Sequence, residues 1–182
     1  MNELDQMAVT DENIDDRKLL INQLMNEYSD SVLHLVYTYV RNRMTAEDLT
    51  QEIFIKCFEK YDQFNQQSSI KTWVYRIAVN HCKDYLRSWH HRKVTLNEKV
   101  MNYIPSKAKH VEEEIITKSE EDSLVNAVMG LPIKYREVVF LHYYEELTLL
   151  EISKVPNVNI NTLKSRLKRA KELLKHKMIE EG

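Results

Sequence analysis

The sequence predicts an all-α protein of two small helical domains joined by a linker. Its 182 residues, 43% hydrophobic and 30% charged, can bury a core and remain in solution. Only 2 glycines and 3 prolines occur, whereas β-sandwiches and barrels need these residues in their many turns. Apolar residues recur every three to four positions, which is typical of amphipathic helices. With glycines only at Gly130 and Gly182, the chain has no glycine-rich phosphate loop.

The apolar periodicity divides the chain into four segments. It is strong in two stretches, absent from an acidic N-terminus, and fades around Pro105 and the acidic run Glu112-Glu113-Glu114. We therefore expect a disordered acidic extension, a first domain, a linker that is at most partly helical, and a second domain. Their boundaries are 1–17, 18–92, 93–118 and 119–182.

Three helices are expected in the first domain. Apolar residues at four-residue spacing predict one over 17–43, broken near Ser29 and Asp30. A sequence resembling a capping box at Thr45 opens the next, which runs to about Tyr61. A polar loop follows, and Ser68 or Ser69 can cap a third helix over about 70–89.

The second domain is expected to contain four helices. A capping box at Ser119 opens the first, which stops at Gly130, and a second runs from Pro132 to about Glu145. Thr148-Leu149-Leu150-Glu151 is another capping box, opening a short helix that ends at Pro156-Asn157. The last helix starts near Ile160.

Charge is distributed unevenly, although the formal net charge is only −2. Residues 1–30 hold eight acids against two bases. Residues 64–93 hold six bases against one acid, and residues 162–178 hold seven against one. Two such basic segments favour binding to a polyanion even in an acidic chain.

The C-terminal basic segment has a helix-turn-helix pattern, a short capped helix followed by a turn and a longer helix. The start of the second helix is then free to enter a DNA major groove, where donor side chains suit base edges and phosphates. A solvated amphipathic helix is the alternative explanation of the charge alone. The candidate contacts are Asn161, Lys164, Ser165, Arg166, Lys168 and Arg169.

The other basic segment interleaves aromatic and basic residues, a composition typical of single-strand binders that stack bases on aromatic rings. The residues concerned are Lys71, Trp73, Tyr75, Arg76, Lys83, Tyr85, Arg87 and Trp89. Trp73 falls on the apolar stripe and is expected in the core, whereas Tyr75 lies off it and is expected to be exposed.

Several other functions are disfavoured. His81, Cys82, His90 and His91 lack the spacing of metal ligands, and Cys57 and Cys82 are expected to be buried thiols. Acids near the start of the 46–61 helix are explained by the helix dipole and by a protein-binding face better than by catalysis. No signal peptide or membrane-spanning run is present, so a cytoplasmic protein is expected. Enzymatic activity, a metal and a cofactor are not expected.

Two pairs of segments together resemble bacterial RNA polymerase sigma factors of the sigma-70 family. AEDLTQEIFIKCFEKYDQF (46–64) and SIKTWVYRIAVNHCKDYLR (69–87) are similar to conserved region 2. LPIKYREVVFLHYYEELTLLEIS (131–153) and NTLKSRLKRAKELL (161–174) are similar to region 4. The short chain without an intermediate domain indicates the extracytoplasmic-function (ECF) subfamily.

The resemblance implies a function for each surface. The 46–61 helix would dock on the β′ clamp helices of core RNA polymerase through Asp48, Gln51, Glu52 and Phe54. The first domain would recognise and melt the promoter −10 element through Lys71, Trp73, Tyr75, Arg76, Asn80, Lys83 and Arg87. The second domain would read the −35 element through Asn161, Thr162, Lys164, Ser165, Arg166, Lys168 and Arg169.

The resemblance also implies further partners. These are the polymerase β flap, promoter DNA and a cognate anti-sigma factor, which is often membrane-bound. The promoter elements lie roughly 50–70 Å apart, at about 35 Å per duplex turn. The 26-residue linker could span roughly 85 Å when extended at about 3.3 Å per residue. Pro156, Asn161 and the loop 66–69 depart from the usual pattern, which leaves the base preferences open.

Two other functions remain open on the sequence. A stand-alone helix-turn-helix regulator would bind a palindromic duplex tightly without polymerase. A helical adaptor that binds only proteins would tolerate charge reversal at Lys164, Arg166 and Arg169. The aromatic-basic helix at 70–89 favours the sigma factor over both.

Overall fold

The computed structural model describes the backbone of residues 3–100 and 120–180 and the side chains of residues 15–90 and 124–179. The described backbone is helical and contains no strand, which confirms the predicted fold class. The helices are α1 (Glu3–Val40), α2 (Arg43–Lys60), η1 (Tyr61–Gln63), α3 (Ile70–Val100), α4 (Glu120–Met129), α5 (Ile133–Val139), η2 (Phe140–Tyr144), α6 (Leu149–Lys154) and α7 (Ile160–Glu180).

α1 and α2 form a helical hairpin joined by only two residues, Arg41 and Asn42. Arg41 adopts a left-handed backbone, with φ of 53°, which turns the chain. Asn42 caps α2 because its Oδ1 accepts a hydrogen bond from the Thr45 backbone N–H at 2.9 Å. The predicted start at Thr45 is therefore three residues late.

α1 is longer and more regular than the sequence predicts. It runs without a break through Ser29 and Asp30, because the buried residues Leu24, Val32 and Val36 keep the helical repeat on both sides of them. It also begins at Glu3, inside the acidic segment expected to be disordered. Acidic residues are favourable at a helix N-terminus, because the helix dipole is positive there.

α3 packs against both helices of the hairpin. Its N-terminus is capped as predicted by Ser69, whose Oγ accepts the Thr72 backbone N–H at 3.2 Å. The helix continues to Val100, so the first residues of the expected 93–118 linker are helical. The remainder of that linker, with Pro105, Glu112-Glu113-Glu114 and the capping residue Ser119, lies outside the described residues.

In the C-terminal half, α4 ends before Gly130 and α5 follows Pro132, as predicted. The helix predicted to run to about Glu145 has an irregular end. Its last turn, η2, is a π-helix in which the Glu145 backbone N–H bonds the carbonyl of Phe140, five residues back. This wide turn places Glu145 against the first half of the protein.

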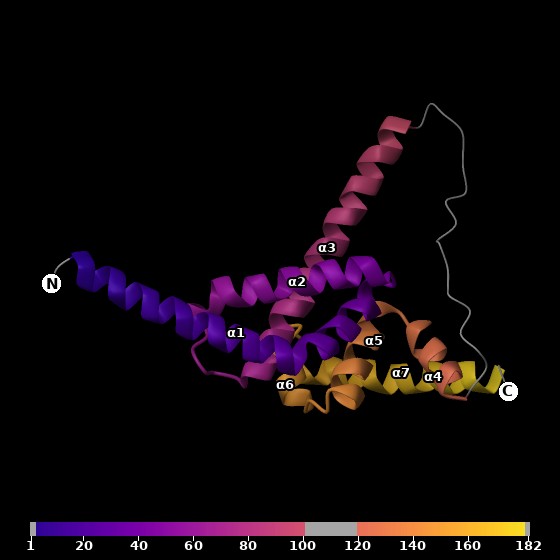
Figure 1. Cartoon of the computed structure of the whole chain (residues 1–182). Helices are drawn as coiled ribbons and strands as arrows, with labels where there is room; N and C mark the ends of the chain where they lie inside the picture. The colour runs from indigo at the N-terminus through magenta and orange to yellow at the C-terminus, as the bar shows by residue number, and fades with distance from the viewer. Residues whose placement is uncertain (1–2, 101–119, 181–182) are drawn as a thin grey trace.

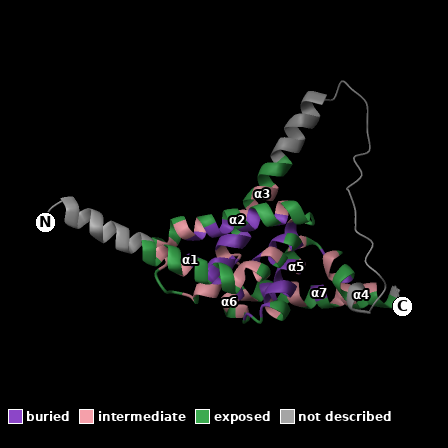
Figure 2. Ribbon diagram, in the orientation of Figure 1, coloured by how far each residue is buried: buried purple, intermediate pink, exposed green. Residues whose placement is uncertain are grey.

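The two halves pack together and share a core (Figure 1). α5 contacts α1, and α6 contacts α3. Val138, Leu141 and Ile152 of the C-terminal half belong to the same buried apolar cluster as α1, α2 and α3. The buried residues accordingly gather between the halves as well as within each one (Figure 2).

Cys57 and Cys82 are both fully buried and free, which confirms the prediction for the thiols. Burial raises the pKa of each thiol to about 12. Both cysteines are therefore uncharged core residues near neutral pH.

Candidate nucleic-acid interface

α7 divides into an apolar side and a polar side. Leu163 and Ala170 are fully buried in the C-terminal half, which orients the helix. Residues 161, 164, 165 and 168 are spaced by three and four positions, so they share the opposite face. Of the predicted −35 residues, Arg166 is half-buried and the others are exposed. The exposed ones are Asn161, Thr162, Lys164, Ser165, Lys168 and Arg169.

The turn before α7 gives the helix-turn-helix its geometry. α6 begins with a complete capping box: Glu151 N–H bonds Thr148 Oγ1 at 3.3 Å, and Thr148 N–H bonds Glu151 Oε2 at 2.9 Å. Asn157, with φ of 53°, reverses the chain, and Asn159 Oδ1 accepts the Asn161 N–H at 2.8 Å. Capping by Asn159 leaves the Asn161 side chain exposed at the start of α7.

The predicted −10 residues of α3 fall into three classes of exposure. Asn80 and Arg87 are exposed, and Lys71, Arg76 and Lys83 are half-buried. Trp73 is only 6% exposed and its ring lies 5.3 Å from that of Phe64, so its predicted burial is confirmed.

The predicted exposure of Tyr75 is wrong, because this residue is 0% exposed. The first turns of α3 are covered by the hairpin on one side and by the C-terminal half on the other. Helical periodicity predicts only the face of α3 that packs on the hairpin. The face that contacts the C-terminal half was therefore expected to be exposed to solvent. Tyr75 Oη donates a hydrogen bond to Glu145. Burial and this carboxylate raise the pKa of Tyr75 well above its usual value.

Glu145 also binds a predicted −10 residue. Lys71 Nζ donates to the Glu145 carbonyl oxygen at 2.8 Å and lies 3.2 Å from its carboxylate. The carboxylate is 5% exposed. Glu145 thus joins the end of η2 to the start of α3.

A second buried carboxylate, Glu137 of α5, is 1% exposed. Lys83 Nζ of α3 lies 2.9 Å from its Oε2, which also accepts a hydrogen bond from Tyr39 of α1. Arg166 Nη1 of α7 lies 3.9 Å from its Oε1. Burial, followed by the charge of Glu137, raises the pKa of Tyr39 well above its usual value.

Neither glutamate is predicted as a functional residue from the sequence, although the apolar pattern carries a signal for one of them. Glu137 is four residues from Ile133 and from Leu141, so it lies on the apolar stripe of its helix. An acid at such a position needs a buried cation. Glu145 gives no such signal, because the π-turn that orients it cannot be read from the sequence.

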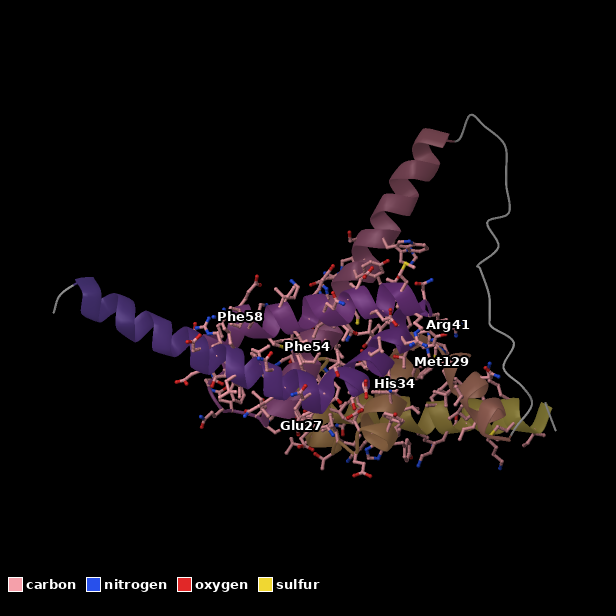
Figure 3. All side chains as sticks on the ribbon, in the orientation of Figure 1. Glu27, His34, Arg41, Phe54, Phe58 and Met129 are labelled. Carbon is pink, nitrogen blue, oxygen red and sulfur yellow. The ribbon has the colours of Figure 1, made fainter. Side chains whose placement is uncertain are left out.

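The polar face of α2 is exposed and mixed in character. Asp48, Gln51 and Glu52 are exposed, and Glu52 Oε2 lies 2.7 Å from His81 Nε2. Phe54, for which the resemblance implies a polymerase contact, is 2% exposed and belongs to the core. Figure 3 labels it on α2 with Phe58, which lies one turn later. The exposed side chains Met44 and Ile55 continue the face, at spacings typical of one helix side.

Models of two protein-family regions match the two halves of the chain. The model of sigma-70 region 2 matches residues 24–92, and that of sigma-70 region 4 matches residues 121–174. Over 162 residues the chain is 30% identical to the ECF RNA polymerase sigma factor SigW of Bacillus subtilis (strain 168), covering 85% of this chain and 87% of SigW. The chain belongs to the ECF subfamily of sigma-70 factors.

A further relative is similar in sequence, and two solved structures share the fold. The ECF RNA polymerase sigma-E factor of Escherichia coli (strain K12) is 28% identical over 164 residues, 86% of this chain and 85% of that protein. Among solved structures, the sigma factor RpoE from Bartonella quintana, in complex with the anti-sigma factor NepR, has a TM-score of 0.66 at 21% identity. That match covers 86% of this chain and 95% of RpoE. CnrH, in complex with the cytosolic domain of CnrY, has a TM-score of 0.64 at 15% identity and covers 91% of each chain.

Within this sigma factor, the region 2 match includes α2 and the described side chains of α3, and the region 4 match includes α6 and α7 as far as residue 174. Among the residues with described side chains, no three His, Cys, Asp or Glu lie close enough to hold a metal ion. No helix in the described part of this sigma factor is both long and apolar enough to cross a membrane.

Proposed function

We propose that this sigma factor binds core RNA polymerase and directs it to specific promoters. In this proposal α3 recognises and melts the −10 element, and α7 reads the −35 element. The observation that carries it is the presence of a separate basic helix face in each of the two family regions. Each face has exposed side chains that suit DNA, Asn80 and Arg87 on α3 and the 161–169 segment on α7.

The chemistry of the two faces supports different tasks. On α7, Lys and Arg can form hydrogen bonds with guanine in the major groove, and Asn can form them with adenine. On α3, basic side chains can hold a separated strand by its phosphates. Melting costs a few kcal/mol for each base that is unstacked. Contacts of the separated strand with α3 would offset that cost. Binding both elements on one polymerase makes the second contact effectively intramolecular.

The exposed face of α2 is the proposed polymerase contact, through Asp48, Gln51 and Glu52. Its mixture of carboxylates with the exposed apolar side chains Met44 and Ile55 suits a protein partner better than DNA. Phe54 supports that face from below, as part of the core. The β flap is the proposed contact of the second domain.

An anti-sigma factor is the proposed regulator. The support is that RpoE of Bartonella quintana, which shares this fold, was solved with the anti-sigma factor NepR. The cytoplasm is the proposed location, since both DNA and polymerase are found there.

Reconstituted transcription tests the function. The purified chain is mixed with core polymerase, and transcription is measured on candidate promoters. We expect a holoenzyme that initiates at specific sites. Failure to form a holoenzyme would contradict the proposal, and tight binding to a palindromic duplex without polymerase would favour the stand-alone regulator.

The −35 contact is tested with Lys164→Ala. The loss of a base contact is expected to cost about 1–3 kcal/mol of promoter discrimination, because one hydrogen-bonding partner of a base is removed. The measurement is holoenzyme affinity for duplexes with single changes in the −35 element. The matched control is Lys175→Ala, an exposed lysine later on the same helix. Equal effects of the two variants would show that only overall charge matters.

The −10 contact is tested with Asn80→Ala, which is expected to slow promoter melting while leaving affinity for core polymerase unchanged. Melting is followed by the fluorescence of a base analogue in the −10 element. The control is Asn26→Ala, an exposed asparagine on α1. A comparable loss of polymerase binding by Asn80→Ala would contradict the assignment.

A further inference from the structure

An ion pair joins the proposed polymerase face of α2 to the helix proposed to melt the −10 element. Glu52 Oε2 of α2 lies 2.7 Å from Nε2 of His81 on α3. α2 and α3 pack against each other in the first half of the chain (Figure 1). Both residues lie within the region 2 match, so this ion pair involves no residue of the C-terminal half.

The two partners differ in how much of the side chain is exposed. The His81 side chain is 14% exposed, whereas that of Glu52 is 55% exposed. His81 is next to Cys82 and one turn after Ala78, both of which are fully buried, so its part of α3 is anchored in the core. The ion pair therefore consists of an anchored histidine and a carboxylate that extends into solvent.

His81 is the donor in this contact. An ionised carboxylate has acceptors and no donor, so a hydrogen atom lies on Nε2 of the imidazole. The neutral ring with its hydrogen on Nε2 and the protonated ring both meet this requirement. A carboxylate has two oxygens, so His81 can hold Glu52 through Oε2 while Oε1 accepts a charge-assisted hydrogen bond from a partner protein.

The ion pair matters more for the orientation of Glu52 than for folding stability. An ion pair with an exposed partner contributes little to stability. An exposed glutamate that nothing holds samples several side-chain conformations, and ordering such a side chain at an interface has an entropic cost. Glu52 lies in the middle of the exposed face that Asp48, Gln51 and Ile55 continue. A carboxylate that is already held there avoids part of that cost when a protein binds.

We propose that His81 is a positioning residue for the polymerase contact, holding the Glu52 carboxylate in the orientation in which a lysine or arginine of polymerase meets it. The inference rests on the proposed function, because it assumes that Glu52 contacts polymerase. His81 acts only through Glu52 and touches neither polymerase nor DNA. Its neighbour Asn80 keeps the separate role in the −10 contact.

The test compares substitutions of His81 in the full chain by their affinity for core polymerase, measured by fluorescence anisotropy of the labelled chain. His81→Leu removes the donor. His81→Gln keeps it, because the amide nitrogen of glutamine lies about as far along the side chain as Nε2 of histidine. We expect His81→Leu to weaken the affinity about three- to tenfold, the effect of freeing one flexible side chain, and His81→Gln to change it by less than about twofold. Equal affinities of wild type and His81→Leu would overturn the proposal.

A second substitution covers the case in which His81→Leu does not fold. His81→Asn has the same amide as His81→Gln on a side chain one methylene shorter, so its donor does not reach Glu52. It is expected to weaken polymerase binding as His81→Leu does. An affinity of His81→Asn equal to that of His81→Gln would overturn the proposal, because the reach of the donor would not matter.

The action of His81 through Glu52 is tested by a double-mutant cycle. Glu52→Ala alone is expected to weaken polymerase binding. Adding His81→Leu to Glu52→Ala is expected to cause no further loss, because no carboxylate remains to be positioned. A further loss as large as that in the wild-type background would overturn the proposal, since His81 would then act independently of Glu52.

The rate of −10 melting at saturating core polymerase separates positioning from a role in DNA contact or in the folding of α3. His81→Leu is expected to melt the promoter at the wild-type rate once all of the chain is bound to polymerase. A slower rate at saturation would overturn the proposal. The matched control is His90→Leu, an exposed histidine later on α3, which is expected to match the wild type in affinity and in rate.

The result is separable from the proposed function. If the wild-type chain and His81→Leu bind core polymerase equally well, the sigma-factor function stands and the positioning role fails. If neither of them binds core polymerase, the proposed function fails and the positioning role fails with it.

Discussion

Arg136 of α5 is buried with no acidic partner among the residues whose side chains are described, unlike Lys83 beside Glu137. It is 5% exposed, and its Nε and Nη1 have no hydrogen-bond partner among the described residues. Burial, and then the nearby charge of Arg41, lower its pKa to about 10. A buried donor without an acceptor costs about 1–3 kcal/mol, so Arg136 is expected to destabilise the folded chain.

Replacement of Arg136 by methionine is therefore expected to raise the free energy of unfolding by about 1 kcal/mol, since it fills similar volume without unpaired donors. Urea denaturation of the full chain measures the change. Lys134→Met, at an exposed position of the same helix, is the control and is expected to change stability by no more than about 0.5 kcal/mol. A less stable Arg136→Met variant would show that the guanidinium has an unidentified partner.

Residue exposure was predictable where the buried residues of a helix lie on one side of it. The polar face of α7 was predicted correctly because Leu163 and Ala170 fix one buried side and leave the other to solvent. Tyr75 was not predictable in this way, because its helix is covered from two directions. The buried role of Glu145 depends on a contact between halves that local spacing does not contain.

At the scale of elements, local chemistry predicted some helix ends and missed others. Thr148 and Glu151 form the capping box that the sequence indicates, and Ser69 caps α3. α2 begins earlier than expected because Asn42 competes successfully with Thr45 as the cap. The π-turn of η2 has no recognised sequence pattern, so only the extent of its helix was predictable.

The capping box gives a prediction with a defined pH dependence. Thr148→Ala is expected to cost about 1 kcal/mol of stability near neutral pH, because the Glu151 N–H loses its acceptor. Hydrogen bonds from the Thr148 side chain and then its backbone N–H lower the pKa of Glu151 below its ordinary 4.5. A lowered folded-state pKa means that this stabilisation is complete above pH 4.5 and is lost as the pH falls through the folded-state pKa.

Urea denaturation of Glu151→Gln from pH 7 to acidic pH tests the sign. The stability difference from the wild type is expected to shrink as the pH falls. A difference that grew on acidification would mean that Glu151 is destabilising when charged.

At the scale of the whole molecule, the core is continuous between halves that the sequence presents as separate domains. The sequence predicts each domain from its own helical periodicity, and this part of the prediction agrees with the all-helical structure. Docking of the halves depends on Val138, Leu141 and Ile152 meeting residues of α1–α3, which lie far away in the chain. Such long-range complementarity leaves no periodic signal.

Because the core is shared, the free chain is expected to unfold in one cooperative transition rather than two. Calorimetry checks this through the agreement of calorimetric and van't Hoff enthalpies. Leu141→Ala is expected to lower the free energy of unfolding by about 2–5 kcal/mol, since it leaves a cavity at a fully buried position. Leu150→Ala, at an exposed position, is the control. Two well-separated transitions in the wild type would contradict a shared core.

α3 extends well beyond the packed body of the molecule before the linker begins (Figure 1). A helix advances about 1.5 Å and turns about 100° with every residue. One residue added to the projecting end of α3 would rotate the last residue of the helix by about 100°, which is more than a quarter turn. It would lengthen the helix by only about 1.5 Å. Four added residues would turn the end of the helix by about 400°, so that the backbone would leave about 40° from the original direction and about 6 Å farther out. The direction in which the backbone leaves the end of α3 at Val100 is consequently set by the number of residues in the helix, and not only by its length.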